Sequence, residues 1–263
     1  MVRFKRLFNR KDAQFSHMTD IVLVVVVAIV LIVATIWVYN YFGAKSQTEI
    51  CKSSVAMQAT TKLGLTPQGL KSPFYIECEK RYVQITNNEV KVGYSPEKID
   101  AVPVYYQGKN IQKFDNLNED ITDQVFAEEL RSCFYQFGEA KVDVFDNSIW
   151  GDNNVCFVCS EIEFKNLPGR YLFSNGLIEY LNRTRIPNEK MTYFDYLNQP
   201  SVSKKSWWEF ASSINNGGNI HIDTNERYAV LFTKQYKMLK TNNYYSYVVP
   251  AEDINLYCDQ EAT

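Results

Sequence analysis

The chain has 263 residues, of which 46% are hydrophobic, and its formal net charge is −2. This length is sufficient for one large domain or two small ones. Residues 1–20 carry five basic and two acidic side chains, which leaves a net charge of about −5 on the rest. A nucleic-acid-binding surface needs concentrated Lys and Arg. The acidic remainder argues against such a surface, and we expect no nucleic-acid partner.

An uninterrupted apolar run occupies residues 21–42 and reads IVLVVVVAIVLIVATIWVYNYF. A helix of about 20 apolar residues, at ~1.5 Å each, crosses the ~30 Å hydrocarbon core of a bilayer. Five basic residues precede the run, whereas only Lys45 and Lys52 follow it closely. Because Lys and Arg concentrate on the cytoplasmic side, we expect a cytoplasmic tail at 1–20 and a single-pass type II transmembrane helix at 21–42. The C-terminal part would then be extracellular, and the lipid bilayer would be one partner.

Two other interpretations of the run are weaker. A cleavable signal peptide has an apolar core of ~7–15 residues and ends at a small-x-small site. Here the run is longer, and its best cleavage site, Phe42-Gly43-Ala44, begins with a bulky residue. A pilin-type leader would need a suitable small residue just before the run, and we see none. A retained signal-anchor therefore remains the preferred interpretation.

All six cysteines lie after the apolar run. They are Cys51, Cys78, Cys133, Cys156, Cys159 and Cys258. An even number of cysteines in a compartment that permits oxidation indicates two or three disulfides, and fifteen complete pairings are possible.

Cys156 and Cys159 form the chain's C-x-x-C pair and allow three interpretations. A zinc site needs four ligands, and His221 is the only histidine after the apolar run. A thioredoxin-like redox pair requires a helix N-terminus, but residues 160–164 alternate polar and apolar side chains as a strand does. We therefore favour structural cysteines, each bonded to a distant partner such as Cys133 or Cys258, and predict no metal and no cofactor.

The first elements after the run combine a helix with strands. Apolar spacing predicts a helix over Thr48–Leu63, which would form a stalk within residues 43–64. Strands are expected at Phe74–Cys78 and over Tyr82–Tyr94, where Asn87-Asn88 would form a hairpin turn with positive φ.

The strongest helical pattern covers Ile121–Phe137. Asp120 is the expected N-cap and Gly138 the stop. Its apolar stripe leaves Glu128 and Glu129 on or beside the solvent face. Strands should follow at Lys141–Phe145 and Val155–Phe164.

The C-terminal third continues the mixture. We predict helices at Leu177–Asn182, Glu189–Leu197 and Lys205–Ile214, and strands at Ile220–Asp223, Arg227–Gln235, Tyr244–Val249 and Ile254–Tyr257. The first two strands would form a hairpin, and part of the Tyr244-Tyr245-Ser246-Tyr247 cluster should be exposed because neighbouring strand residues face opposite sides. Residues 65–263 are thus expected to form one disulfide-stabilised α+β domain with a mixed, mainly antiparallel sheet.

The sequence contains no phosphate-binding loop, dinucleotide fingerprint, nucleophile elbow or zinc-protease helix. His221 is interpreted as a polar strand residue, and Glu161 and Glu163 as a solvated strand face. We therefore predict no catalytic residue. Asn182 begins a glycosylation sequon, Asn-Arg-Thr, on the expected outer side of the membrane.

Three strings behind the N-terminal apolar run resemble a family of uncharacterised single-pass membrane-anchored proteins of small-genome archaea. They are AEELRSCFYQFGEAK at 127–141, CFVCSEIEF at 156–164 and TYFDYL at 192–197. The similarity covers roughly residues 51–197, and Ala140 departs from an expected glycine. The resemblance implies an archaeal cell-surface location and a shared cysteine framework. It implies no activity, substrate or catalytic residue.

These observations predict a non-enzymatic binding or structural protein anchored in the cell membrane. Its outer domain would contact a protein partner in a cell-envelope or secretion assembly. The alternative is a cell-surface enzyme, either a thiol oxidoreductase that uses Cys156 and Cys159 or a hydrolase.

Overall fold

The computed structural model forms two units, Met1–Ser46 and Gln47–Thr263. The residues that the structure describes are 22–35, 47–59, 76–97, 99, 105–106, 109–110, 113–141, 154–173, 176–198, 221–237, 240–258 and 260–261.

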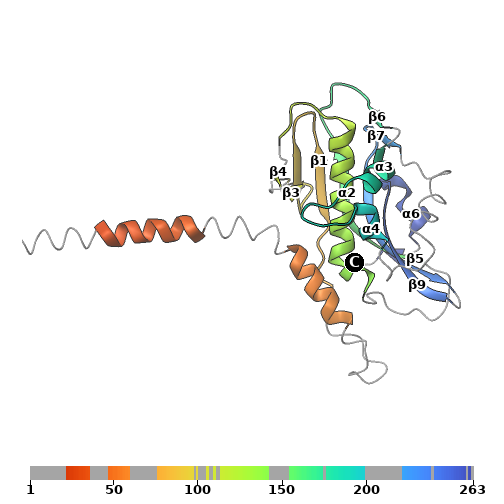
Figure 1. Cartoon of the computed structure of the whole chain (residues 1–263), viewed down its shortest axis with the longest axis horizontal. Coiled ribbons are helices and arrows are strands. Elements are labelled where there is room, and N and C mark those ends of the chain that lie inside the picture. The colour runs from red at the N-terminus through yellow and green to blue at the C-terminus, as the bar shows by residue number, and fades with distance from the viewer. Residues whose placement is uncertain are drawn as a thin grey trace, which may run out of the picture. The chain divides into compact units, whose positions relative to one another are not determined.

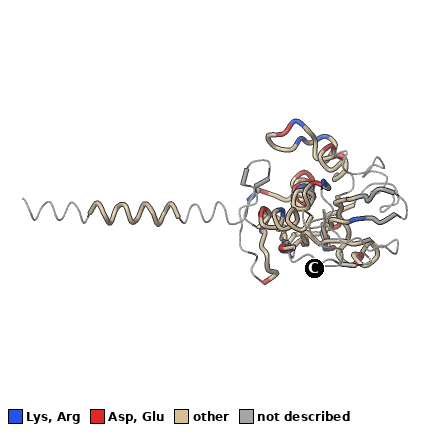
Figure 2. The backbone as a smooth tube through the Cα atoms, turned by 90° about the horizontal axis from the view of Figure 1, so that it is seen from below, with Lys and Arg blue, Asp and Glu red and all other residues tan. Residues whose placement is uncertain are grey.

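The described part of the first unit is a helix at residues 22–35, which carries no charged side chain (Figures 1 and 2). Its large apolar side chains are exposed, from 49% for Val27 to 67% for Leu23. Residues 21 and 36–42 of the predicted transmembrane helix lie outside the described residues. No helix within the described ranges combines the length and the apolar character needed to cross a membrane. The transmembrane helix therefore stays a prediction.

A six-stranded sheet forms the centre of the second unit (Figure 1). Its strands are β1 (Arg81–Ile85), β2 (Val90–Gly93), β5 (Asn154–Phe164), β8 (Tyr228–Lys237), β9 (Lys240–Pro250) and β10 (Gln260–Glu261). The order is β2-β1-β5-β8-β9, and β10 pairs with β5. β1 and β10 are parallel to β5, and the other pairs are antiparallel. The expected α+β fold with a mixed, mainly antiparallel sheet is confirmed.

Two small two-stranded sheets accompany the main one. β3 (Tyr105–Tyr106) pairs with β4 (Lys109–Asn110), and β6 (Leu172–Phe173) pairs with β7 (Ile222–Asp223). The predicted hairpin between Ile220–Asp223 and Arg227–Gln235 is therefore wrong. β8 instead pairs with β5 and β9, because its long apolar run can be buried only inside the main sheet.

The hairpin between β1 and β2 is confirmed, but its turn differs from the prediction. Neither Asn87 nor Asn88 has positive φ. The Thr86 N–H donates to the Glu89 carbonyl at 2.9 Å, and the Glu89 N–H donates to the Thr86 hydroxyl at 3.1 Å. A side-chain hydroxyl thus closes the turn without left-handed backbone.

The long helix α2 (Glu119–Gln136) packs against both the sheet and the helices α3 (Gly176–Arg183) and α4 (Tyr193–Leu197) (Figure 1). Asn118, rather than Asp120, is its N-cap, and the Asn118 side chain accepts the Ile121 N–H at 2.9 Å. Gly138, at φ 67°, ends the helix as expected and begins the 3₁₀ turn η1 (Gly138–Ala140). Because α2 is covered on two sides, Glu128 and Glu129 are buried, and their predicted solvent exposure is wrong.

The helix at residues 47–59 belongs to the second unit. Cys51, Val55 and Ala59 lie one turn apart and are buried in its core, as a stripe at helical spacing should be. The Tyr135 hydroxyl of α2 donates to Glu49 at 3.0 Å. This part of the predicted stalk therefore contributes side chains to the folded domain.

Several C-terminal predictions need correction. Ile254–Tyr257 is the short helix α6, preceded by the 3₁₀ turn η2 (Ala251–Asp253), and is not a strand. α4 begins later than predicted, after Thr192, whose side chain and Asp195 form a capping box. Tyr244, Tyr245 and Tyr247 are all buried because both faces of β9 are covered.

Other predicted elements lie earlier in the chain or outside the described residues. Ile76–Cys78, expected as a strand, has no regular structure. Residues 142–145 and 205–214 lie outside the described residues.

Candidate functional site

All six cysteines are paired at bonding distance. The pairs are Cys51–Cys78, Cys133–Cys159 and Cys156–Cys258, with Cα–Cα separations of 4.5, 5.5 and 5.5 Å. This finding supports the predicted disulfide-stabilised domain.

Cys156 and Cys159 lie on opposite faces of β5. Phe157 and Cys159 face α2, where the Phe157 ring lies 4.9 Å from Phe137 and Cys159 bonds Cys133. Cys156 points the other way and bonds Cys258, which follows α6. The alternation of strand side chains thus gives the two cysteines different partners. Neither is a free thiol, so the pair has no reactive sulfur for exchange or for binding zinc.

The other residues singled out from the sequence do not converge on one site. His221 is exposed just before β7. Glu161 pairs with Lys80 at 2.6 Å, and Glu163 pairs with Lys165 at 2.7 Å. Asn182 is exposed on α3, where a sequon is accessible. Within the residues described, no three His, Cys, Asp or Glu side chains are grouped as metal ligands would be.

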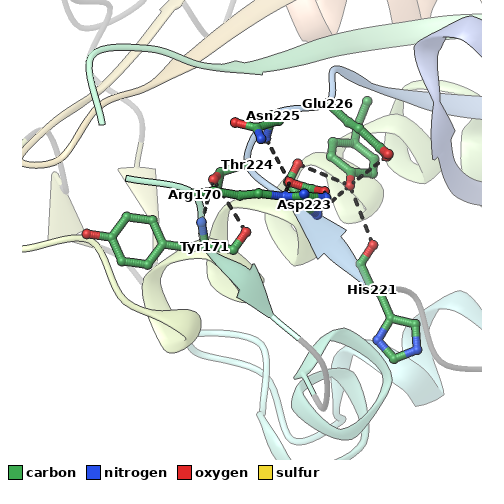
Figure 3. Close-up of polar contacts among 8 residues, drawn as sticks. Arg170, Tyr171, His221, Asp223, Thr224, Asn225 and Glu226 are labelled. Atoms are coloured by element: carbon green, nitrogen blue, oxygen red, sulfur yellow. Dashed lines mark hydrogen bonds and ion pairs between the residues drawn. The ribbon is translucent and has the colours of Figure 1, made fainter. Parts of the chain in front are cut away.

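A polar cluster that the sequence analysis missed surrounds the turn after β7 (Figure 3). The Glu226 N–H donates to the Asp223 carbonyl at 3.0 Å, and the Asn225 N–H donates to the Asp223 carboxylate at 3.0 Å. Arg170 donates to both carboxylate oxygens of Asp223, through Nε at 3.0 Å and through Nη2. We call residues 223–227 the Asp223 turn.

Tyr228 contacts the turn through its hydroxyl group. Its hydroxyl accepts the Asp223 N–H at 2.6 Å and lies 3.3 Å from the Glu226 carboxylate, to which it can donate (Figure 3). A second hydrogen bond joins the turn to the residue just before β6, because the Tyr171 N–H donates to the Thr224 hydroxyl at 2.9 Å. The turn is therefore held by the side chains of Arg170 and Tyr228 and by the backbone of Tyr171.

The electrostatics of the cluster favour fixed charge over proton transfer. The hydrogen bonds from Arg170 and from the Asn225 backbone hold the pKa of Asp223 below its usual range. Burial, assisted by the nearby Glu226 charge, raises the pKa of Tyr228. A carboxylate that stays ionised and a phenol that stays protonated are poor bases and nucleophiles near neutral pH. The cluster can hold a surface rigid, and it offers no activated group.

The Asp223 turn and His221, the residue before β7, present exposed polar side chains. His221, Asn225, Glu226 and Arg227 are exposed, whereas Asp223, Thr224 and Tyr228 are buried. A sequence signal for this arrangement existed in Asp223-Thr224-Asn225-Glu226, a typical Asx-turn composition. The ion pair between Arg170 and Asp223 joins residues 53 apart in the chain, so this sequence pattern could not predict it.

A second polar group lies inside the domain, along α2. Glu128 accepts hydrogen bonds from Tyr193 and from Arg131, the latter at 2.8 Å. Glu129 accepts from Arg81 at 2.6 Å. Burial, and then the neighbouring Glu128 charge, raises the pKa of Tyr193. Asp123 differs from these carboxylates, because both of its buried oxygens have no hydrogen-bond partner.

Replacing Tyr228 with Phe should destabilise the Asp223 turn. The Asp223 N–H would lose its acceptor in a buried place, at a cost of about 1–3 kcal/mol. We expect a lower urea midpoint and faster hydrogen exchange at residues 223–227. Tyr171→Phe is the matched control, since the Tyr171 backbone, and not its hydroxyl, contacts Thr224. An equal loss in both variants would contradict the assigned role of the Tyr228 hydroxyl.

Comparison with known proteins gives no relative. No family model matches the chain, and neither a curated protein nor a solved structure is significantly similar to it. The structure by itself defines the second unit as a disulfide-linked α+β domain with a six-stranded mixed sheet.

Proposed function

We propose that the chain is a membrane-anchored binding or structural protein. Its α+β domain would lie outside the cell membrane and contact a protein partner, for example in a cell-envelope or secretion assembly. Three features support this proposal, and each concerns a different part of it: the anchor, the compartment and the binding.

The anchor is supported by the apolar run 21–42 and by the uncharged, exposed helix at 22–35 inside it. Apolar surface in water costs ~25 cal/mol per Å² relative to an apolar environment. Side chains such as Leu23, Leu31 and Ile32 are about 60% exposed. A bilayer would remove this cost, and the basic residues before the run favour a cytoplasmic N-terminus.

The outer compartment is supported by the cysteines. Three disulfides use every cysteine of the chain, and structural disulfides persist where the environment is oxidising. Two of them join elements across the core, α2 to β5 and β5 to the segment after α6.

Binding is supported most directly by the Asp223 turn, which is the observation that carries the proposal. A surface already held in one conformation loses little entropy when a partner binds. The bidentate Arg170–Asp223 pair and the Tyr228 hydroxyl hold the backbone, while His221 and Asn225 remain exposed for contact. The bonds of Cys156 and Cys159 to different cysteines are a reason to propose a binding role rather than a thiol oxidoreductase.

The proposal predicts a complex larger than the monomer when the full chain is extracted from its own membranes in mild detergent. A double variant, His221→Ala with Asn225→Ala, should weaken that complex, because both side chains are exposed and neither supplies a side-chain hydrogen bond to the turn. Glu189→Ala, an exposed position before α4, is the matched control. Native electrophoresis with mass spectrometry measures the complex.

Two outcomes would overturn the proposal. Recovery of the monomer alone, with and without crosslinking, would remove partner binding. Release of the chain from membranes by alkaline carbonate would remove the anchor, since a spanning helix resists such extraction.

A further inference from the structure

Asp123 occupies an unusual position in the contact between α2 and α3. It is 1% exposed, and neither carboxyl oxygen has a hydrogen-bond partner. Buried polar groups are nearly always hydrogen-bonded, because losing water without a replacement is costly, and far more costly for a charged group. The other buried carboxylates of α2, Glu128 and Glu129, both have such partners.

The Asp123 carboxyl lies directly against the first residue of α3. A Cβ atom added to Gly176 would lie 2.2 Å from Asp123 Oδ2 and 2.7 Å from Oδ1. Such distances are well inside van der Waals contact, so the Asp123 carboxyl can occupy this position only because residue 176 has no side chain. The carboxyl is thus shielded from water at the contact between α2 and α3.

The charges around Asp123 are mostly of its own sign. Glu119 and Asp120 lie on α2, and Glu179 lies on α3. Arg183 of α3 is the cation that acts on it, but Arg183 is itself engaged by Asp120 at 2.8 Å and by Glu179 at 3.7 Å. The surroundings therefore offer an ionised Asp123 neither a hydrogen bond nor an uncommitted positive charge.

We propose that Asp123 makes the packing of α3 on α2 depend on pH, so that α3 is held in place when the Asp123 carboxyl is protonated and loosens when it ionises. This device is independent of the binding role proposed above. It would control the segment that carries the exposed Asn182 sequon and supports α4, since α3 contacts both α2 and α4.

The direction follows from linkage between protonation and folding. Burial, and then the charges of Glu119 and Asp120, raises the pKa of Asp123 to about 7 in the docked state. With α3 displaced, water reaches the carboxyl and its pKa returns toward ~3.9. A raised pKa in the docked state stabilises docking fully at low pH. That stabilisation is lost as the pH rises from about 4 to 7 and stays lost above.

Hydrogen exchange of the full chain in mild detergent tests the proposal. Deuterium uptake of peptides covering 176–183 would be measured at pH 5, 6, 7 and 8 and corrected for the intrinsic exchange rate. We expect the opening constant of α3 to rise about tenfold per pH unit up to pH 7, and then to level off. Peptides from β8, in the centre of the sheet, should show much less change.

Two variants test whether the Asp123 carboxyl causes the pH dependence of α3 opening. Asp123→Asn keeps the size of the side chain and cannot ionise, so its opening constant should vary less than about threefold over this range. In Asp120→Asn, an exposed position one turn earlier, the opening constant should still rise with pH. It should reach its plateau at a slightly lower pH, because one repelling charge is gone.

Three results would overturn the proposal: an unchanged pH dependence of the opening constant in Asp123→Asn, an equal pH dependence in α3 and β8 of the wild type, or protection of α3 that increases with pH. The last result would mean that ionised Asp123 caps the first N–H groups of α3.

Discussion

Replacing Arg81 with Met should destabilise the second unit by about 3–5 kcal/mol, the cost of leaving one member of a buried ion pair without its partner. Arg81 donates to Glu129 at 2.6 Å, and the two side chains are only 12% and 2% exposed. Met fills a similar volume, so most of the loss would come from the stranded Glu129 charge. Urea unfolding of the full chain in detergent, followed by fluorescence, measures the change.

Two comparisons make this expectation specific. The double variant Arg81→Met with Glu129→Leu should recover much of the loss, because no unpaired charge remains. Arg183→Met breaks an ion pair to Asp120 whose side chains are 56% and 73% exposed, and should cost less than about 1 kcal/mol. Equal losses in Arg81→Met and Arg183→Met would show that burial of the Arg81–Glu129 pair has no energetic consequence.

Removing the Cys156–Cys258 disulfide should cost more than removing Cys133–Cys159. The first closes a loop of 102 residues and the second a loop of 26. A crosslink restricts the unfolded chain more when the loop is longer, which gives about 4–5 kcal/mol for the first and about 3–4 kcal/mol for the second. Paired Cys→Ala variants, compared by urea midpoint, measure both.

All four cysteines are buried, so the space left by each substitution is similar in the two variants. The difference between them therefore reports loop length more than packing. A larger loss for the Cys133–Cys159 variant would contradict the loop-closure argument. It would indicate instead that the link between α2 and the sheet dominates.

Much of the fold was predictable from local pattern. The apolar stripe after Asn118 located α2, and the alternating run through Cys156 and Cys159 located β5. The hairpin of β1 and β2 followed from two alternating runs around polar residues. These elements are recognisable because each has one repeating period over many residues.

Two of the errors, the predicted exposure of the α2 glutamates and of the β9 tyrosines, share one physical cause, which is coverage on more than one side. Glu128 and Glu129 fall off the apolar stripe of α2, yet both are buried. Glu128 lies against α4, where Tyr193 donates to it, and Glu129 lies against β1, where Arg81 donates to it. Tyr245 and Tyr247 are buried although strand alternation points them away from α2. A periodic pattern identifies the face that must be buried, but it does not show whether the opposite face is also covered.

The ion pair of the Asp223 turn and the burial of Asp123 could not be predicted from sequence for a related reason. Asp223 is an ordinary turn residue until Arg170, 53 positions earlier, forms its ion pair with it. Asp123 is an ordinary polar helix residue until Gly176 brings α3 against its carboxyl. In both cases the chemistry depends on a neighbour supplied by another element.

The sequence by itself determined the α+β class, the long elements α2, β5, β8 and β9, and the location of the cysteines after the apolar run, because hydrophobic period and composition are local properties. The tertiary structure alone decided which cysteines pair, which carboxylates are buried and which polar turn is fixed. Strand alternation already separates Cys156 from Cys159. Which sulfur meets each of them depends on α2 covering one face of β5 and the segment after α6 covering the other. Both contacts join segments that are far apart in the chain, and no local sequence pattern predicts them.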